Sequence, residues 1–142
     1  MQIVPSSFCA RPALELAPAL LGMTLRREAV VARITEVEAY AYPDDSANHC
    51  YRGVTARNRV MWGPPGHAYV YLCYGMHHLL NVVSDADGQG AAVLIRSVEI
   101  LAGHQQVKSR RGGRTGADLT AGPGKVGQAF ALDRTWSGHA LF

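Results

Sequence analysis

The most distinctive pattern of polar and apolar residues is an alternation that runs from Arg33 to Tyr40. Successive side chains of a β-strand point to opposite faces, so a strand here places Glu36, Glu38 and Tyr40 on one face. The other face then carries Thr35, Val37 and Ala39. A face with two carboxylates and a phenol ring is unlike an ordinary core face, and it is therefore a candidate functional surface.

A loop is predicted directly after this strand. Pro43 has a fixed φ angle, and Asp44 and Asp45 favour turns, so the extended run ends here. The chain reaches His49 only after this loop. A carboxylate, an aromatic ring and an imidazole can therefore converge on one pocket.

The rest of the chain contains further extended runs. β-branched residues are frequent from Thr24 to Tyr40, which predicts strands in this region. Three later runs are separated by turn signals, as is typical of an antiparallel meander. These runs are His67–Cys73, Leu79–Ser84 and Ala91–Leu101.

Helices are predicted near the two ends of the chain. Between Ala10 and Gly22, leucines recur and the glycine is placed as a terminator, while Pro18 either lies in the first turn of a short helix or kinks a longer one. Thr55 is placed to cap a short helical turn, and Pro123 suits the first position of a final helix. We therefore expect an α+β fold: a single domain over residues 1–142, with a curved, mainly antiparallel β-sheet, peripheral helices and a protruding β-hairpin.

Composition narrows the class of protein only slightly. A chain of 142 residues, 48% hydrophobic and 18% charged, is sized for one domain with a real core. The net charge of +3 permits a polyanionic partner without requiring one. Three cysteines without a Cys-x-x-Cys spacing indicate reduced intracellular thiols, and no cysteine or histidine pattern predicts a metal site.

Other features exclude some locations and cofactors. No apolar run approaches membrane-spanning length, and the N-terminus lacks the pattern of a signal peptide. The segment Gly122-Pro123-Gly124-Lys125 lacks the spacing of a phosphate-binding loop, so we assign it no nucleotide role. We expect a cytoplasmic monomer without a cofactor or membrane contact.

A second informative segment runs from Tyr69 to Met76. Strand parity places Tyr69 and Tyr71 on one face and leaves Tyr74 beside a glycine turn, at the tip of a hairpin. Exposed aromatic and methionine side chains at a tip form a wedge suited to insertion between bases. The alternative is ordinary packing on the edge of the sheet.

Arg96 and Asn81 are polar residues inside apolar runs. Parity places Arg96 on the same face as Ala92, Leu94 and Val98. A buried guanidinium needs an anion, and either Glu38 or a phosphate would serve, unless Arg96 snorkels from the sheet edge. Asn81 either satisfies backbone groups or faces a ligand.

Several basic residues have open roles. The polar stretch from Gly103 to Gly124 is predicted to be an exposed helix end and a loop, whose basic side chains are either simply solvated or in contact with phosphates. These side chains are Lys108, Arg110, Arg111 and Arg114. Arg57 and Arg59 either touch phosphates or pair with Asp44 and Asp45.

Taken together, several segments resemble the ordered motifs of the alkyladenine (3-methyladenine) DNA glycosylase family in its bacterial form. The segments are RITEVEAY, DDSANH, TARNRVMWGPPGHAYVYLCYGM, LLNVV and AAVLIRSVEIL. They occur in the family's order, and the resemblance extends from about Leu20 to Leu132. Long motifs in a fixed order are far more specific than any single short pattern.

The resemblance implies a monofunctional glycosylase that flips an alkylated or deaminated purine out of double-stranded DNA and hydrolyses its N-glycosidic bond. Glu38 matches the general base that activates water, and Arg96 matches a polar partner near the catalytic water. Tyr40, His49 and Tyr71 match residues that stack against the flipped base, and His49 also matches a contact to the sugar-phosphate. Asn81 matches a residue that crowds the guanine amino group. Tyr74 matches the side chain that fills the gap in the duplex, and Met76 belongs to the same wedge.

Members of that family usually continue for several tens of residues beyond the position of Phe142. The resemblance therefore implies that this chain lacks the C-terminal part of the family domain, including core strands and part of the pocket wall. A non-catalytic protein that binds damaged DNA, or an inactive fragment, is the alternative to an active glycosylase. Release of the base from a lesion duplex distinguishes these possibilities.

Overall fold

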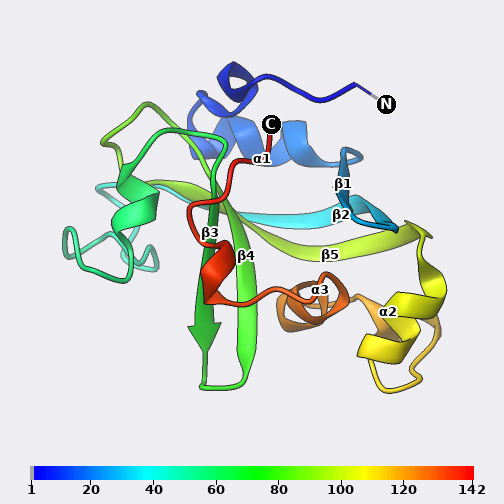
Figure 1. The fold of residues 1–142 in the computed structure, drawn as a ribbon. Helices are drawn as coiled ribbons and strands as arrows, with labels where there is room; N and C mark the ends of the chain where they lie inside the picture. Colours follow the sequence, from blue (N-terminus) through cyan, green and yellow to red (C-terminus); the bar gives the residue numbers. More distant parts are fainter. Residues whose placement is uncertain (1) are drawn as a thin grey trace.

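A computed structural model describes residues 2–142, which form a five-stranded antiparallel sheet with three α-helices (Figure 1). The order of strands in the sheet is β1-β2-β5-β4-β3. The strands are β1 (Thr24–Arg27), β2 (Val30–Tyr40), β3 (Ala68–Cys73), β4 (His77–Val83) and β5 (Ala92–Ala102), and the helices are α1 (Ala13–Leu20), α2 (His104–Arg110) and α3 (Pro123–Ala129). Short 3₁₀ helices lie at Ser6–Cys9, Arg59–Trp62, Gly116–Leu119 and Arg134–Trp136. The predicted α+β class and the β3-β4-β5 meander are confirmed.

The N-terminal region differs from the sequence pattern in two details. The extended run from residue 24 to residue 40 is a hairpin, because Glu28 adopts a positive φ of 54° and reverses the chain between β1 and β2. Pro18 lies inside α1, near its C-terminal end, so the alternative that placed it in the first turn is wrong. Pro18 has no N–H to donate to the carbonyl of Leu14 in the preceding turn, and the helix ends two residues after it.

The two longest strands, β2 and β5, each contain a β-bulge at the same position along the sheet, beyond which their alternate side chains point to the opposite faces. Their register shifts on either side of the Glu36 and Ser97 pair, so that Thr35 on β2 and Arg96 on β5 have no cross-strand partner. An extra residue in a strand reverses the alternation beyond it. The core residues of β2 are consequently Val30, Ala32 and Ile34 before the shift, and Val37 and Ala39 after it.

This double bulge, formed by the unpaired Thr35 and Arg96, corrects two predictions and preserves a third. Val98 belongs to the main core, whereas Ala92 and Leu94 belong to the cluster on the opposite face, so Val98 does not share a face with them as parity predicted. Thr35 is exposed rather than aligned with the core residues of β2. Glu38 and Tyr40 remain on one face, as expected.

Each face of the sheet has its own apolar cluster. The main core lies where α1 packs on β2 and where α3 packs on β4 and β5, so both helices cover the same face. A smaller cluster on the other face joins Tyr69, Tyr71 and Leu94 of the sheet to Cys50 and Met61 of the long segment between β2 and β3. The candidate site lies on this second face.

Strands β3 and β4 form the protruding hairpin (Figure 1). Tyr74 and Gly75 at its turn both have positive φ angles, 51° and 66°, and the N–H of Met76 donates to the carbonyl of Cys73 at 3.1 Å. Two successive positive φ angles are the requirement of the tight hairpin turns that suit twisted strands. The predicted hairpin is therefore confirmed.

Helix α3 holds the hairpin through two glycines. A Cβ atom at Gly124 would lie 2.8 Å from the His77 ring, and one at Gly127 would lie 1.9 Å from the carbonyl oxygen of His78. Gly127 lets the helix backbone approach β4 this closely, and Gly124 leaves room for the His77 ring. The direction of the hairpin is thus fixed by backbone packing.

The described residues contain no helix that is long and apolar enough to cross a membrane. All three cysteines, Cys9, Cys50 and Cys73, are free thiols.

Candidate active site

Glu38 is at the centre of a polar chain that crosses β2 and β5. One carboxylate oxygen accepts a hydrogen bond from the Tyr40 hydroxyl, and the other accepts one from Arg96 Nη1 at 2.9 Å. Arg96 also donates through Nε to Glu36 at 3.2 Å, and the Ser97 hydroxyl donates to the other oxygen of Glu36 at 2.9 Å. The candidate anion for Arg96 is therefore Glu38, joined by Glu36.

An aromatic wall stands on the same face of the sheet. His49 lies against Tyr71, with ring centroids 4.3 Å apart, and its Nδ1 is 3.2 Å from the Tyr69 hydroxyl. Arg57 covers the ring of Tyr71 at 5.2 Å and donates to the carbonyl of Leu72 at 3.0 Å. The loop after β2 thus brings the imidazole against the rings of β3.

Two buried asparagines hold the loop that carries His49. The Asn48 amide donates to the carbonyls of Ala41 and Gly90, at 2.7 and 3.0 Å. The Asn58 amide donates to the carbonyls of His49 and Gly53, at 2.9 and 3.0 Å. A buried amide that satisfies several backbone groups fixes a loop more firmly than apolar contact does. Sequence reasoning assigned no role to either residue.

Thr55 caps the neighbouring turn, as predicted. Its hydroxyl accepts a hydrogen bond from the backbone N–H of Asn58 at 3.1 Å, and the side-chain oxygen Oδ1 of Asn58 accepts one from the backbone N–H of Thr55 at 2.7 Å. The 3₁₀ helix at Arg59–Trp62 follows directly. The sequence signal that would have identified Asn58 is the spacing Thr-x-x-Asn before a helical turn, which is a reciprocal capping pattern.

A small cavity lies between these groups. Its lining includes Tyr40 from the polar chain and the three rings of the aromatic wall. The lining residues are Tyr40, Asn48, His49, Met61, Tyr69, Tyr71 and Asn81. Asn81 is 2% exposed and donates to the Tyr69 carbonyl at 3.2 Å, so it satisfies a backbone group and also lines the cavity. The volume is about 10 Å³, enough for one water molecule. A larger cavity of about 610 Å³ borders the main core near β1 and the C-terminal segment, away from Glu38.

Burial determines the protonation of the aromatic wall. It raises the pKa of Tyr69 to about 12 and also raises the pKa of Tyr71. The pKa of Tyr40 is raised by burial first and then by its hydrogen bond to Glu38. The pKa of His49 is lowered, chiefly by burial and secondly by the Arg57 charge. The wall is therefore uncharged at neutral pH.

The hairpin tip stands apart from the cavity. Tyr74 is 93% exposed and Met76 is 73% exposed, so neither side chain packs on the edge of the sheet. The structure therefore separates two groups of predicted residues. Tyr40, His49, Tyr71 and Asn81 meet at the cavity with Glu38 and Arg96 beside Tyr40, whereas Tyr74 and Met76 lie at the tip.

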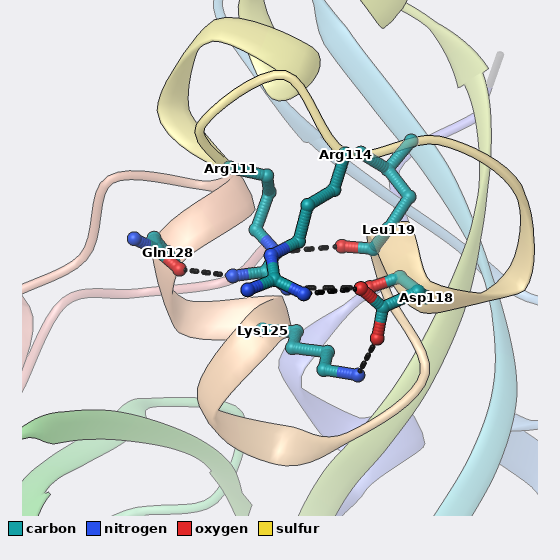
Figure 2. Close-up of polar contacts among 6 residues, drawn as sticks. All are labelled: Arg111, Arg114, Asp118, Leu119, Lys125 and Gln128. Carbon is teal, nitrogen blue, oxygen red and sulfur yellow. Dashed lines mark hydrogen bonds and ion pairs between the residues drawn. The ribbon is translucent and has the colours of Figure 1, made fainter.

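The basic stretch after β5 is largely paired within the protein. Arg111 donates to the carbonyls of Leu119 and Asp118 and to the Gln128 side chain, which closes the loop against α3 (Figure 2). Arg114 and Lys125 both bind the Asp118 carboxylate, at 2.8 and 2.6 Å, and lower its pKa to about 2. These cations are therefore paired within the loop, an arrangement that the sequence did not predict.

The arrangement places a carboxylate held by two donors beside aromatic rings that carry no charge. A fixed carboxylate can accept a proton from water, and uncharged aromatic rings can stack on a ring system. Among residues 2–142, no cluster of three or more histidine, cysteine, aspartate or glutamate side chains could hold a metal ion.

Comparison with known proteins gives the class of this protein. The family described as methylpurine-DNA glycosylase (MPG) matches residues 7–142. A relative from Nitrosococcus oceani, provisionally named a 3-methyladenine DNA glycosylase, is 55% identical over 99% of this chain and 70% of its own length. The DNA-3-methyladenine glycosylase of Arabidopsis thaliana is 54% identical over 100% of this chain and 56% of its own length.

The chain belongs to the methylpurine-DNA glycosylase family. The resemblance inferred from the sequence motifs is thereby confirmed. The chain spans a little over half of the Arabidopsis relative and about 70% of the Nitrosococcus one. The roles of the individual site residues are predictions.

Proposed function

We propose that this protein removes damaged purines from double-stranded DNA by hydrolysing the N-glycosidic bond with a water molecule activated by Glu38. The observation that carries this proposal is the position of Glu38. Its carboxylate is held by Arg96 and by Tyr40, and Tyr40 lines the cavity together with the rings of His49, Tyr69 and Tyr71. The names of the relatives support the same activity.

The flipped base would enter between Tyr40 and the pair formed by His49 and Tyr71. The rings of His49 and Tyr71 are in contact with each other, so no base fits between these two rings. The cavity holds about one water molecule at present, so the side chains that line it must move apart to admit a purine. Tyrosine faces favour a cationic alkylated purine, and an uncharged His49 does not repel it.

The chemistry follows from the contacts of Glu38. A carboxylate has about four acceptor positions, so the bonds from Tyr40 and Arg96 leave room for a water molecule. As the N-glycosidic bond breaks, its electron pair leaves with the base and positive charge develops on the sugar, which the carboxylate stabilises. The water oxygen forms the new bond to the sugar carbon, and Glu38 accepts the proton.

The hairpin tip supplies the element that opens the duplex. Removing a base from the stack costs a few kcal/mol, and an inserted aromatic side chain offsets part of that cost. Tyr74 and Met76 are exposed on a hairpin whose direction is fixed by α3, so they meet DNA without rearrangement of the protein. Lesion binding is therefore assigned to the tip and the aromatic wall together.

Single-turnover release of base from a hypoxanthine or 3-methyladenine duplex tests the activity. Glu38→Gln should abolish release and leave lesion binding intact. Glu99→Gln is the matched control, because Glu99 lies on β5 and pairs with Arg33 of β2 without touching the site. Undiminished release by Glu38→Gln would refute the role of this carboxylate.

A second pair of variants tests the wedge. Tyr74→Ala and Met76→Ala should weaken binding to the lesion duplex, whereas Leu14→Ala should not, although Leu14 on α1 is 72% exposed, close to the 73% of Met76. If the wild-type chain binds lesions but releases no base, the protein is a damaged-DNA-binding protein instead.

A further inference from the structure

Glu36 is the one carboxylate of the polar chain that has no place in the reaction described above. It contacts neither the cavity nor Glu38 directly, yet two side chains of β5 bind it. Arg96 Nε donates to one oxygen at 3.2 Å, and the Ser97 hydroxyl donates to the other at 2.9 Å. Both oxygens of Glu36 are therefore engaged by the strand that carries Arg96.

We propose that Glu36 is a positioning residue, which fixes the guanidinium of Arg96 so that Arg96 holds the Glu38 carboxylate in place. The inference rests on the proposed role of Glu38. Arg96 reaches the two carboxylates through different nitrogens, Nε to Glu36 and Nη1 to Glu38. A planar guanidinium bound at two points has a defined orientation, whereas one bound at a single point can rotate.

The double bulge explains why Arg96 needs a second anchor. Arg96 lies at a register shift and has no cross-strand partner on β2, so the regular ladder does not set the direction of its side chain. Ser97, the residue paired with Glu36, is adjacent to it. The shift in register thus places Arg96 between the two carboxylates and gives Glu36 a fixed position from which to hold it.

A simple surface ion pair would not have this arrangement. Arg33 and Glu99 form such a pair across the same two strands, with one contact of 3.0 Å. The side chains of Arg96, Glu36 and Glu38 are likewise all more than one third exposed, so the cluster contributes little to the stability of the fold. Its effect is on geometry, and Glu99 provides a control at a similar level of exposure.

The expected effect is a loss of rate without a loss of binding. A displacement of about 1 Å at a reacting group can cost about 100-fold in rate. Glu36→Ala should therefore lower the single-turnover rate of base release by about 10-fold to 100-fold and change the lesion Kd by less than about twofold. Glu36→Gln should recover much of the rate, because an amide oxygen still accepts from Arg96 Nε.

Glu99→Ala and Glu99→Gln are the matched controls and should leave both the rate and the urea midpoint close to those of the wild type. Equal rates in Glu36→Ala and Glu99→Ala would overturn the positioning role. A Glu36→Ala variant that loses binding as strongly as rate would overturn it as well. Absence of base release by the wild-type protein would instead count against the proposed function.

A measurement independent of activity keeps the two proposals separable. The Nε–H group of Arg96 should give a protected ¹⁵N–¹H correlation, identified by its disappearance in Arg96→Lys. In Glu36→Ala this signal should shift and exchange rapidly with water, whereas in Glu99→Ala it should not change. An unchanged Arg96 signal in Glu36→Ala would show that Glu36 does not hold the guanidinium.

Discussion

Asn58 should be among the most sensitive polar positions in this protein. It is 2% exposed, and its side chain makes three hydrogen bonds, to the N–H of Thr55 and to the carbonyls of His49 and Gly53. Each such bond contributes about 1 kcal/mol net. Asn58→Ala, which removes all three bonds, should therefore lower the free energy of unfolding by about 3 kcal/mol.

Urea denaturation measures this loss. With a slope of about 2 kcal/mol per molar urea, a change of about 3 kcal/mol lowers the midpoint by about 1.5 M. The matched control is Asn81→Ala. Asn81 is also 2% exposed but makes one side-chain hydrogen bond, to the Tyr69 carbonyl, so its replacement should cost about 1 kcal/mol. A loss at Asn58 no larger than that at Asn81 would refute the reasoning.

Two further predictions concern packing and protonation. Gly124→Ala should lower the urea midpoint by an amount equivalent to about 1–3 kcal/mol, and adding His77→Ala should restore the midpoint because the clash is with that ring. Gly127→Ala is the control, because its clash is with backbone and His77→Ala should not relieve it. Failure of His77→Ala to restore the stability of Gly124→Ala would contradict the packing argument. The pKa of His49 in the folded protein should lie below 6.5 when measured by NMR, and Arg57→Gln should raise this pKa. Between the folded pKa and 6.5 the unfolded state binds more protons, so the free energy of unfolding should rise with pH across that window. A titration midpoint of His49 at or above 6.5 would contradict the burial argument.

Much of the fold could be predicted from the sequence because its signals are local. The meander was marked by turn residues between extended runs, and the tip by the Tyr74-Gly75 turn. The convergence of Glu38, Tyr40 and His49 followed from one strand and one loop. The motif resemblance supplied roles that spacing alone left open, and the family comparison confirmed the membership.

The features that escaped prediction depend on contacts between distant residues. The bulges at Thr35 and Arg96 require each other across two strands, and neither residue type marks a bulge by itself. The roles of Asn48 and Asn58 depend on which carbonyls the folded loop presents. The ion pairs of Arg114 and Lys125 with Asp118 likewise depend on the folded conformation of the loop, which the sequence alone does not specify. Propensity and periodicity contain no information about such partners.

The double bulge also changes what the sequence must preserve at Thr35. Its side chain is exposed and belongs to neither apolar cluster, so the identity of this residue contributes little. Its presence as one extra residue, however, determines on which side of the sheet Glu38 and Tyr40 emerge. The spacing between the core half of β2 and the half that carries Glu38 and Tyr40 is therefore constrained in length rather than in composition. Strand β2 should accept many replacements at this position but not the loss of the residue.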